Sequence, residues 1–290
     1  MAQQGKGFKL KGHESFIVRE GWLQKGLAAV QEDPNVFSIH AGADALGVGT
    51  NMAKSIRYWL RAFGLTVEQQ RKGVELTRWG QFLYEKDPYL EHPVSLWLLH
   101  SVLAGNEELA TVWYLFFNRL YVNRLTREEL ELRMETEMRL YTEGQSFSVK
   151  SLQDDCAALL HMYLPAQERD YDPEEKTRSP FGELGLLTME GKQIVCQTPV
   201  AGMLPVSVVY YVLLKQAVGG NSMSMDAALE GENSPGRIFY MSRTMLYEYL
   251  LTMQHKNMLV MNRTAGLDMI YFPQIVTEDR VFAALEQLYP

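Results

Sequence analysis

The chain has 290 residues, enough for one large domain or for two to three small ones. Apolar residues make up 47% of it, which favours a packed core over disorder. Its two cysteines, Cys156 and Cys196, are too few for a disulfide framework and lie in no zinc-ligand pattern, so a reducing compartment fits best. We find neither a secretory signal nor an apolar run near the ~20 residues of a transmembrane helix. We therefore expect a cytoplasmic protein without a membrane partner.

Charge is distributed unevenly along the chain. The net charge is −7, but the first 80 residues hold eleven Lys and Arg against seven Asp and Glu, a net charge of +4. The remaining residues therefore carry −11. A basic N-terminal part is compatible with a local nucleic-acid contact, although ordinary scatter of surface charge explains the numbers equally well.

The N-terminal region predicts an arm and a short helix. Residues 1–12 are rich in Gly, Lys and Gln and predict a loose arm. Trp22–Gln31 shows amphipathic helical spacing, and Asp33-Pro34 ends that helix.

Residues 46–65, LGVGTNMAKSIRYWLRAFGL, predict a second helix with two distinct faces. Thr50 or Asn51 is expected to cap its start, and Gly64 is expected to end it. One apolar stripe holds Met52, Ile56, Trp59, Leu60 and Phe63. The opposite face is predicted to be purely cationic and holds Lys54, Arg57 and Arg61.

A short hairpin follows this basic helix. Leu65–Val67 and Val74–Leu76 are strand candidates joined by the polar turn EQQRKG, and Thr77 can cap another helix. Helices, then a basic helix, then a hairpin form the order of a winged helix-turn-helix. We predict that the basic helix is a DNA recognition helix.

The rest of the chain predicts more helices and a second hairpin. Residues 94–140 are almost continuously helical, and residues 165–180 are polar, proline-bearing and acidic, as in a linker or an exposed loop. Further elements are expected as follows: a helix capped by Ser148 or Ser151, a strand at Gln193–Gln197, a helix at Leu204–Ala217, a flexible stretch at Gly219–Met225, a helix capped by Ser242, and hairpin strands at Met258–Met261 and Leu267–Phe272.

The last helix and hairpin repeat the N-terminal order, which predicts a second winged-helix-like unit. Its helix has mixed charge, so we expect it to pack against a protein. The expected fold is mainly α with short β-hairpins (α+β), built of winged-helix-type modules joined by a helical region. The expected domains are a DNA-binding domain at 1–93, a helical region at 94–178 and a winged-helix-like domain at 179–290.

Five segments in order carry a family resemblance over nearly the whole chain: HESFIVREGWLQKGL, LGVGTNMAKSIRYWLRAFGL, KDPYLEHPVSLWLLH, SPFGELGLL and SPGRIF. Together they resemble the SspB family of the bacterial Ssp system, which places phosphorothioate sulfur in DNA. The resemblance implies a DNA nicking endonuclease that takes part in phage defence. It also implies three partners: a cysteine desulfurase, an ATPase and a reductase-like sulfur-transfer protein. It transfers no catalytic residue, because none of these segments is a catalytic signature.

Candidate DNA-binding residues come from the basic helix and the arm. Cations and small polar residues on a recognition helix meet phosphates and base edges, and a helix N-terminus favours phosphate. The helix candidates are Thr50, Asn51, Lys54, Arg57 and Arg61, and the arm candidates are Lys6, Lys9, Lys11 and Arg19. The alternative is that the helix cations form an ordinary solvated face.

Nicking requires an activated nucleophile, usually with carboxylates that hold a metal such as Mg²⁺ or Mn²⁺. The candidates are His13, Glu14, Asp154, Asp155 and Glu183. His13-Glu14 also fits a capping or surface pair. Asp154 and Asp155 point about 100° apart on one helix and are expected to favour its positive end.

Two other hypotheses are compatible with these residues. One is a non-catalytic winged-helix adaptor or regulator that recruits sulfur-transfer partners to DNA. The other is a helical scaffold that binds only proteins, which the acidic body favours and the basic N-terminal part does not.

Overall fold

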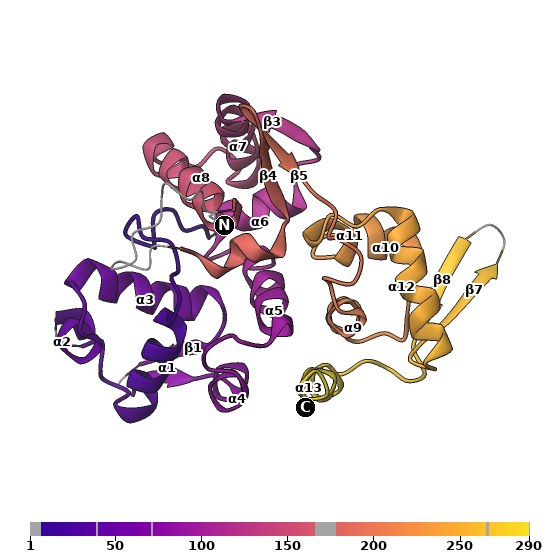
Figure 1. Cartoon of the computed structure of the whole chain (residues 1–290), viewed down its shortest axis with the longest axis horizontal. Coiled ribbons are helices and arrows are strands. Elements are labelled where there is room, and N and C mark those ends of the chain that lie inside the picture. The colour runs from indigo at the N-terminus through magenta and orange to yellow at the C-terminus, as the bar shows by residue number, and fades with distance from the viewer. Residues whose placement is uncertain (1–6, 39, 71, 166–177, 265–266, 290) are drawn as a thin grey trace, which may run out of the picture. The chain divides into compact units, whose positions relative to one another are not determined.

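The computed structural model describes residues 7–38, 40–70, 72–165, 178–264 and 267–289. The chain forms two compact units, unit 1 at Met1–Val195 and unit 2 at Cys196–Pro290 (Figure 1). Helices dominate both units and small sheets accompany them, so the predicted α+β class is confirmed. The predicted domain boundaries at residues 93 and 178 both fall inside unit 1, and the three-part division stays a prediction. Among the described residues, no helix is both long and apolar enough to cross a membrane.

Unit 1 begins with helices followed by a hairpin (Figure 1). The elements are α1 (Trp22–Glu32), η1 (His40–Gly42), α2 (Ala43–Leu46), α3 (Thr50–Ala62), β1 (Thr66–Gln69), β2 (Gly73–Leu76) and α4 (Arg78–Lys86). The α3 helix packs on α1 through the apolar stripe predicted from its sequence, of which Ile56, Trp59, Leu60 and Phe63 are fully buried.

Glycine ends α3 as predicted. Gly64 has a φ of 66°, a left-handed conformation that glycine adopts without a steric cost. The Leu65 N–H then donates to the Leu60 carbonyl at 2.8 Å and turns the chain into β1. The strands β1 and β2 pair antiparallel, and the Thr77 side chain caps α4. The start of α3 differs from the prediction, because Gly49 is the N-cap and neither Thr50 nor Asn51 supplies a capping side chain.

The remainder of unit 1 surrounds an aromatic core. Its elements are α5 (Pro93–Ala104), α6 (Thr111–Asn118), β3 (Arg124–Thr126), α7 (Arg127–Tyr141), α8 (Val149–Tyr163), η3 (Pro180–Leu184), β4 (Leu187–Glu190) and β5 (Gln193–Cys196). Every residue of α6 is buried, and α5 is buried at almost every position, as expected for helices that are apolar all round. The Ser148 side chain caps α8. The predicted linker at 165–180 falls largely on residues 166–177, which lie outside the described residues.

Unit 2 repeats this alternation of helices and short strands. Its elements are α9 (Val206–Gln216), β6 (Ser222–Ser224), α10 (Met225–Glu230), α11 (Pro235–Ile238), α12 (Arg243–His255), β7 (Val260–Thr264), β8 (Leu267–Tyr271) and α13 (Glu278–Glu286). The Ser242 cap and the β7–β8 hairpin agree with the predictions. The expected flexible stretch Gly219–Met225 is wrong in its centre, because Ser222–Ser224 pairs with β8 through backbone hydrogen bonds.

One element order occurs twice in the chain. The series α6–β3–α7–α8–β4–β5 and α9–β6–α10–α12–β7–β8 both run helix, strand, two helices, two strands; the first also contains the short η3 and the second the short α11. Their sheets have the strand orders β3-β5-β4 and β6-β8-β7, so in each sheet the last strand lies in the middle. Both units therefore contain the same small arrangement.

Candidate nucleic-acid interface

The exposed end of α3 presents the first three helix candidates. Thr50, Asn51 and Lys54 are exposed, whereas the neighbouring Ala53 and Ile56 are fully buried. The N-cap is Gly49, which has no side chain to hydrogen-bond to the first amide groups of the helix. Free N–H groups and the positive end of the helix dipole favour an anion at this position.

The other two cations of α3 are already paired. Arg57 and Arg61 lie 38% and 39% exposed, and both contact Glu68 on β1. The distances to Glu68 Oε1 are 2.9 Å from Arg57 Nε, 2.8 Å from Arg57 Nη2 and 3.3 Å from Arg61 Nη1. The guanidinium of Arg57 also stands 5.8 Å from the ring centre of Phe37. The prediction of a purely cationic face is therefore wrong, because a carboxylate from the hairpin shares this surface.

The predicted loose arm is anchored from residue 7 onward. The Lys9 N–H donates to Thr111 Oγ1 at 3.0 Å, and the Lys11 N–H donates to both carboxylate oxygens of Asp155 at 3.0 and 3.1 Å. Lys11 Nζ lies 2.6 Å from Asp154 Oδ2. That hydrogen bond lowers the pKa of Asp154 and raises the pKa of Lys11. Of the arm cations, Lys11 is thus neutralised by a neighbour.

The other arm candidates are placed differently. The Lys9 residue is exposed. The Arg19 guanidinium stands over two aromatic rings, 5.7 Å from the centre of Phe16 and 5.3 Å from that of Trp22. Such stacking holds a guanidinium in place without neutralising its positive charge. The candidate Lys6 lies outside the described residues.

His13 and Asp155 form a buried pair. Their side chains are 0% and 2% exposed, and His13 Nε2 lies 2.8 Å from Asp155 Oδ1. The imidazole stacks on Trp59 at 5.8 Å and meets Trp113 edge-on at 5.9 Å. The Nδ1 atom is buried without a hydrogen-bond partner. Gly12, the residue before His13, packs against the ring of Tyr58. A Cβ added at Gly12 would collide with that ring.

The nuclease candidates are therefore only partly brought together. Asp154 and Asp155 lie in the second turn of α8 and bind the arm, so the expectation that they favour the positive end of the helix is wrong. The His13 side chain pairs with Asp155 and not with Glu14, which is exposed. Glu183 is exposed in η3, whose N-cap is Ser179.

A metal ion in a nuclease site needs a set of oxygen or nitrogen donors that lie close together. Within the described residues, no group of three or more His, Cys, Asp or Glu side chains is arranged to hold a metal ion. A Mg²⁺ or Mn²⁺ ion bound to this part of the chain would therefore need ligands besides such a group, such as water or substrate phosphates.

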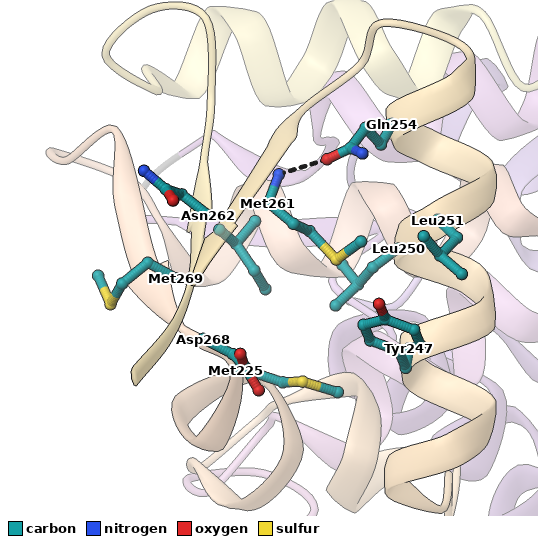
Figure 2. Close-up of a pocket in the computed structure, with 10 residues that line it drawn as sticks. Met225, Tyr247, Leu250, Leu251, Gln254, Met261, Asn262, Asp268 and Met269 are labelled. Carbon is teal, nitrogen blue, oxygen red and sulfur yellow. Dashed lines mark hydrogen bonds between the residues drawn. The ribbon is translucent and has the colours of Figure 1, made fainter. Parts of the chain in front are cut away.

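Unit 2 contains a pocket of about 270 Å³ between α12 and the β7–β8 hairpin (Figure 2). The Met261 N–H donates to Gln254 Oε1 at 2.7 Å and ties the hairpin to the helix. The lining residues are Met225, Tyr247, Leu250, Leu251, Gln254, Met261, Asn262, Asp268, Met269 and Ile270. Thioether and leucine side chains make an adaptable apolar wall, and no cation lines it. The pocket suits an apolar group rather than a phosphate.

These features define a two-unit α+β protein that repeats one small helix–strand arrangement and carries a partly neutralised basic helix in its N-terminal region. Residues 10–289 match the sequence profile described as "Protein of unknown function (DUF4007)", and the chain belongs to this family. No curated protein sequence matches the chain significantly.

Two crystal structures of SspB, one of them magnesium ion-bound, are similar to this chain. The magnesium ion-bound structure has a TM-score of 0.85 and 27% identity, and the other has a TM-score of 0.85 and 28% identity. Each match covers 97% of this chain and 88% of the SspB chain. The predicted resemblance to the SspB family is confirmed.

Proposed function

We propose that this chain is the SspB-type component of a bacterial DNA phosphorothioation system. In this role it binds DNA in the cytoplasm and nicks it so that sulfur can enter the backbone, as part of phage defence. The observation that carries the proposal is the likeness to SspB over 97% of the chain. Its partners would be a cysteine desulfurase, an ATPase and a reductase-like sulfur-transfer protein.

DNA contact is assigned to a winged-helix module made of α1, α3 and the β1–β2 hairpin. The start of α3 supports this assignment, because it offers the exposed Thr50, Asn51 and Lys54 at a helix N-terminus without a capping side chain at Gly49. Further along the same helix lie Arg57 and Arg61, which contact Glu68 in this structure and whose guanidinium groups could make bidentate contacts to phosphate or to guanine edges. The repeated element order runs from α6 to β5 and from α9 to β8, so it supports further winged-helix modules in both units rather than the module that contains α3.

The arm adds phosphate contacts in this proposal. The exposed Lys9 and the ring-supported Arg19 provide its free cations. The Lys11 ammonium remains bound to Asp154, and its main contribution is to hold the arm in place.

The nicking step of the proposal calls for an activated nucleophile, which a metal ion can supply. The magnesium ion-bound state of the SspB neighbour is the reason to test Mg²⁺ and Mn²⁺. Mg²⁺ in nucleic-acid enzymes commonly combines one or two carboxylates with substrate phosphates. Glu14 and Glu183 have exposed carboxylates, so they are the first candidates to replace.

The test is incubation of the full chain with supercoiled plasmid, with and without Mg²⁺ or Mn²⁺, followed by electrophoresis. We expect open circles only with metal, and we expect Glu14→Gln or Glu183→Gln to abolish them if that carboxylate is catalytic. The matched control is Glu85→Gln, which removes an exposed carboxylate from α4. Plasmid that is retarded but uncut under every condition rules out the nickase.

A second function is favoured by the pocket in unit 2. A non-catalytic adaptor would bind DNA through α3 and a sulfur-transfer partner through the apolar pocket beside α12 (Figure 2). The mixed charge of α12 supports a protein contact there. Retarded but uncut plasmid, together with weaker partner binding by Tyr247→Ala, would establish the adaptor.

A further inference from the structure

We propose that Glu68 competes with DNA for two arginines. In the free protein the Glu68 carboxylate pairs with Arg57 and Arg61, and on DNA binding a backbone phosphate replaces it. This inference rests on the proposed DNA contact through α3. It adds a regulatory feature to that contact, because the hairpin of the same module would set how strongly and at what salt concentration the helix binds.

The arrangement of Arg57 and Arg61 around Glu68 resembles two arginines that bind one phosphate. A single oxygen, Glu68 Oε1, lies 2.8 Å from Arg57 Nη2, 2.9 Å from Arg57 Nε and 3.3 Å from Arg61 Nη1. A guanidinium fork holds carboxylate and phosphate oxygens in the same way. Glu68 Oε1 therefore marks the position that a phosphate oxygen would take between these two side chains.

The contact is exposed enough to exchange. The side chains of Arg57, Arg61 and Glu68 are 38%, 39% and 34% exposed. Ion pairs at the surface are weak and screened by salt. Glu68 sits in the β1–β2 ladder opposite Val74, so the strand can stay paired while only the side chain turns away.

The residues around Arg57 support its guanidinium and leave space for a phosphate. The ring of Phe37, 5.8 Å from the Arg57 guanidinium, supports the cation independently of Glu68. Arg57 and Glu68 both line a pocket of about 470 Å³, whose wall also contains the polar side chains of Asn35, Ser38 and Gln69. This pocket can receive a phosphate or the displaced carboxylate.

The experiment compares DNA binding by the full chain and by Glu68→Gln, measured by fluorescence anisotropy with a labelled duplex over a series of salt concentrations. We expect Glu68→Gln to bind about two- to fivefold more tightly at low salt, as the release of one exposed ion pair permits.

Two further variants separate competition from net charge and from folding. Glu85→Gln removes one exposed carboxylate from α4 and should leave the affinity nearly unchanged. Glu68→Asp keeps the charge but withdraws the carboxylate by one methylene, and it should also tighten binding. Melting curves establish that each variant is folded.

Three results would overturn the inference. The first is an unchanged affinity in both Glu68 variants while the wild-type chain binds DNA, which leaves the proposed DNA contact intact. The second is equal tightening in Glu68→Gln and Glu85→Gln, which attributes the effect to net charge. The third is a wild-type chain that does not bind DNA at all, which overturns the proposed function as well.

Discussion

Replacing Asp155 by alanine should detach the arm from α8 and destabilise unit 1. The Asp155 carboxylate accepts the Lys11 N–H at 3.0 and 3.1 Å, and it lies 2.8 Å from His13 Nε2. Its side chain is 2% exposed and that of His13 is 0% exposed, so water cannot replace the lost contacts without opening the structure. The substitution leaves a buried imidazole and an arm amide without their acceptor.

The expected loss follows from these two orphaned groups. Each buried donor left without a partner costs about 1–3 kcal/mol, and breaking one side of a buried pair costs about 3–5 kcal/mol. We expect the free energy of unfolding of unit 1 to fall by about 3–5 kcal/mol. At roughly 2–4 °C per kcal/mol for a domain of this size, the Tm should fall by roughly 6–20 °C.

The assay is thermal unfolding followed by circular dichroism, combined with limited proteolysis of the first 15 residues. Asp155→Asn retains one acceptor oxygen and should lose less stability than Asp155→Ala. The matched control is Asp154→Asn, which should barely change the Tm because the Lys11–Asp154 pair is exposed and screened. If Asp155→Ala has the same Tm as the wild type and its arm is cleaved by protease no faster, the buried pair does not anchor the arm.

Three other variants test the packing and the proposed contact. Arg57→Glu combined with Arg61→Glu should weaken DNA binding and reduce the salt slope by about 1.8 for two lost phosphate contacts; unchanged affinity with a native circular dichroism spectrum would refute the role of α3. Leu60→Ala should lower the free energy of unfolding by about 2–5 kcal/mol in urea denaturation, because Leu60 is 0% exposed, and an unmoved midpoint would contradict its place in the core. Gly12→Ala should cost about 1–3 kcal/mol in a thermal melt through its collision with Tyr58, whereas an unchanged Tm would mean that the ring moves freely.

Elements with local signals were predictable from the sequence. Periodic apolar residues defined α3, and Gly64 marked its end. Thr77 and Ser242 each lie at the N-cap of the helix that they were expected to start. These features depend on contacts within a few residues, which a sequence pattern records directly.

Long-range contacts were not predictable in the same way. The strands β3 and β6 have three residues each and owe their existence to partners far along the chain. The sequence pattern predicts a polar turn at Glu68, because nothing near this residue in the sequence indicates that it faces Arg57. The Asp155–His13 contact joins residues 142 positions apart, so a pattern of neighbours gave no sign of it.

The site was less predictable than the fold for a related reason. From the sequence, a charged residue is predicted to bind DNA or to act in catalysis from its residue type and its position on a helix. The structure shows that Lys11, Arg57 and Arg61 each face an acidic side chain from another element. Charge on one helix face thus indicates a surface, but only the tertiary contacts reveal how much of that charge is available.

The anchored arm also has a consequence for synthesis of the chain. The Lys11 amide emerges from the ribosome 144 residues before its acceptor Asp155. At about 5–20 residues per second, the N-terminal segment must wait roughly 7–30 s for that acceptor. During this interval the aromatic cluster around Trp59 lacks its cover, and nascent chains that stop before α8 would expose it to chaperones and proteases.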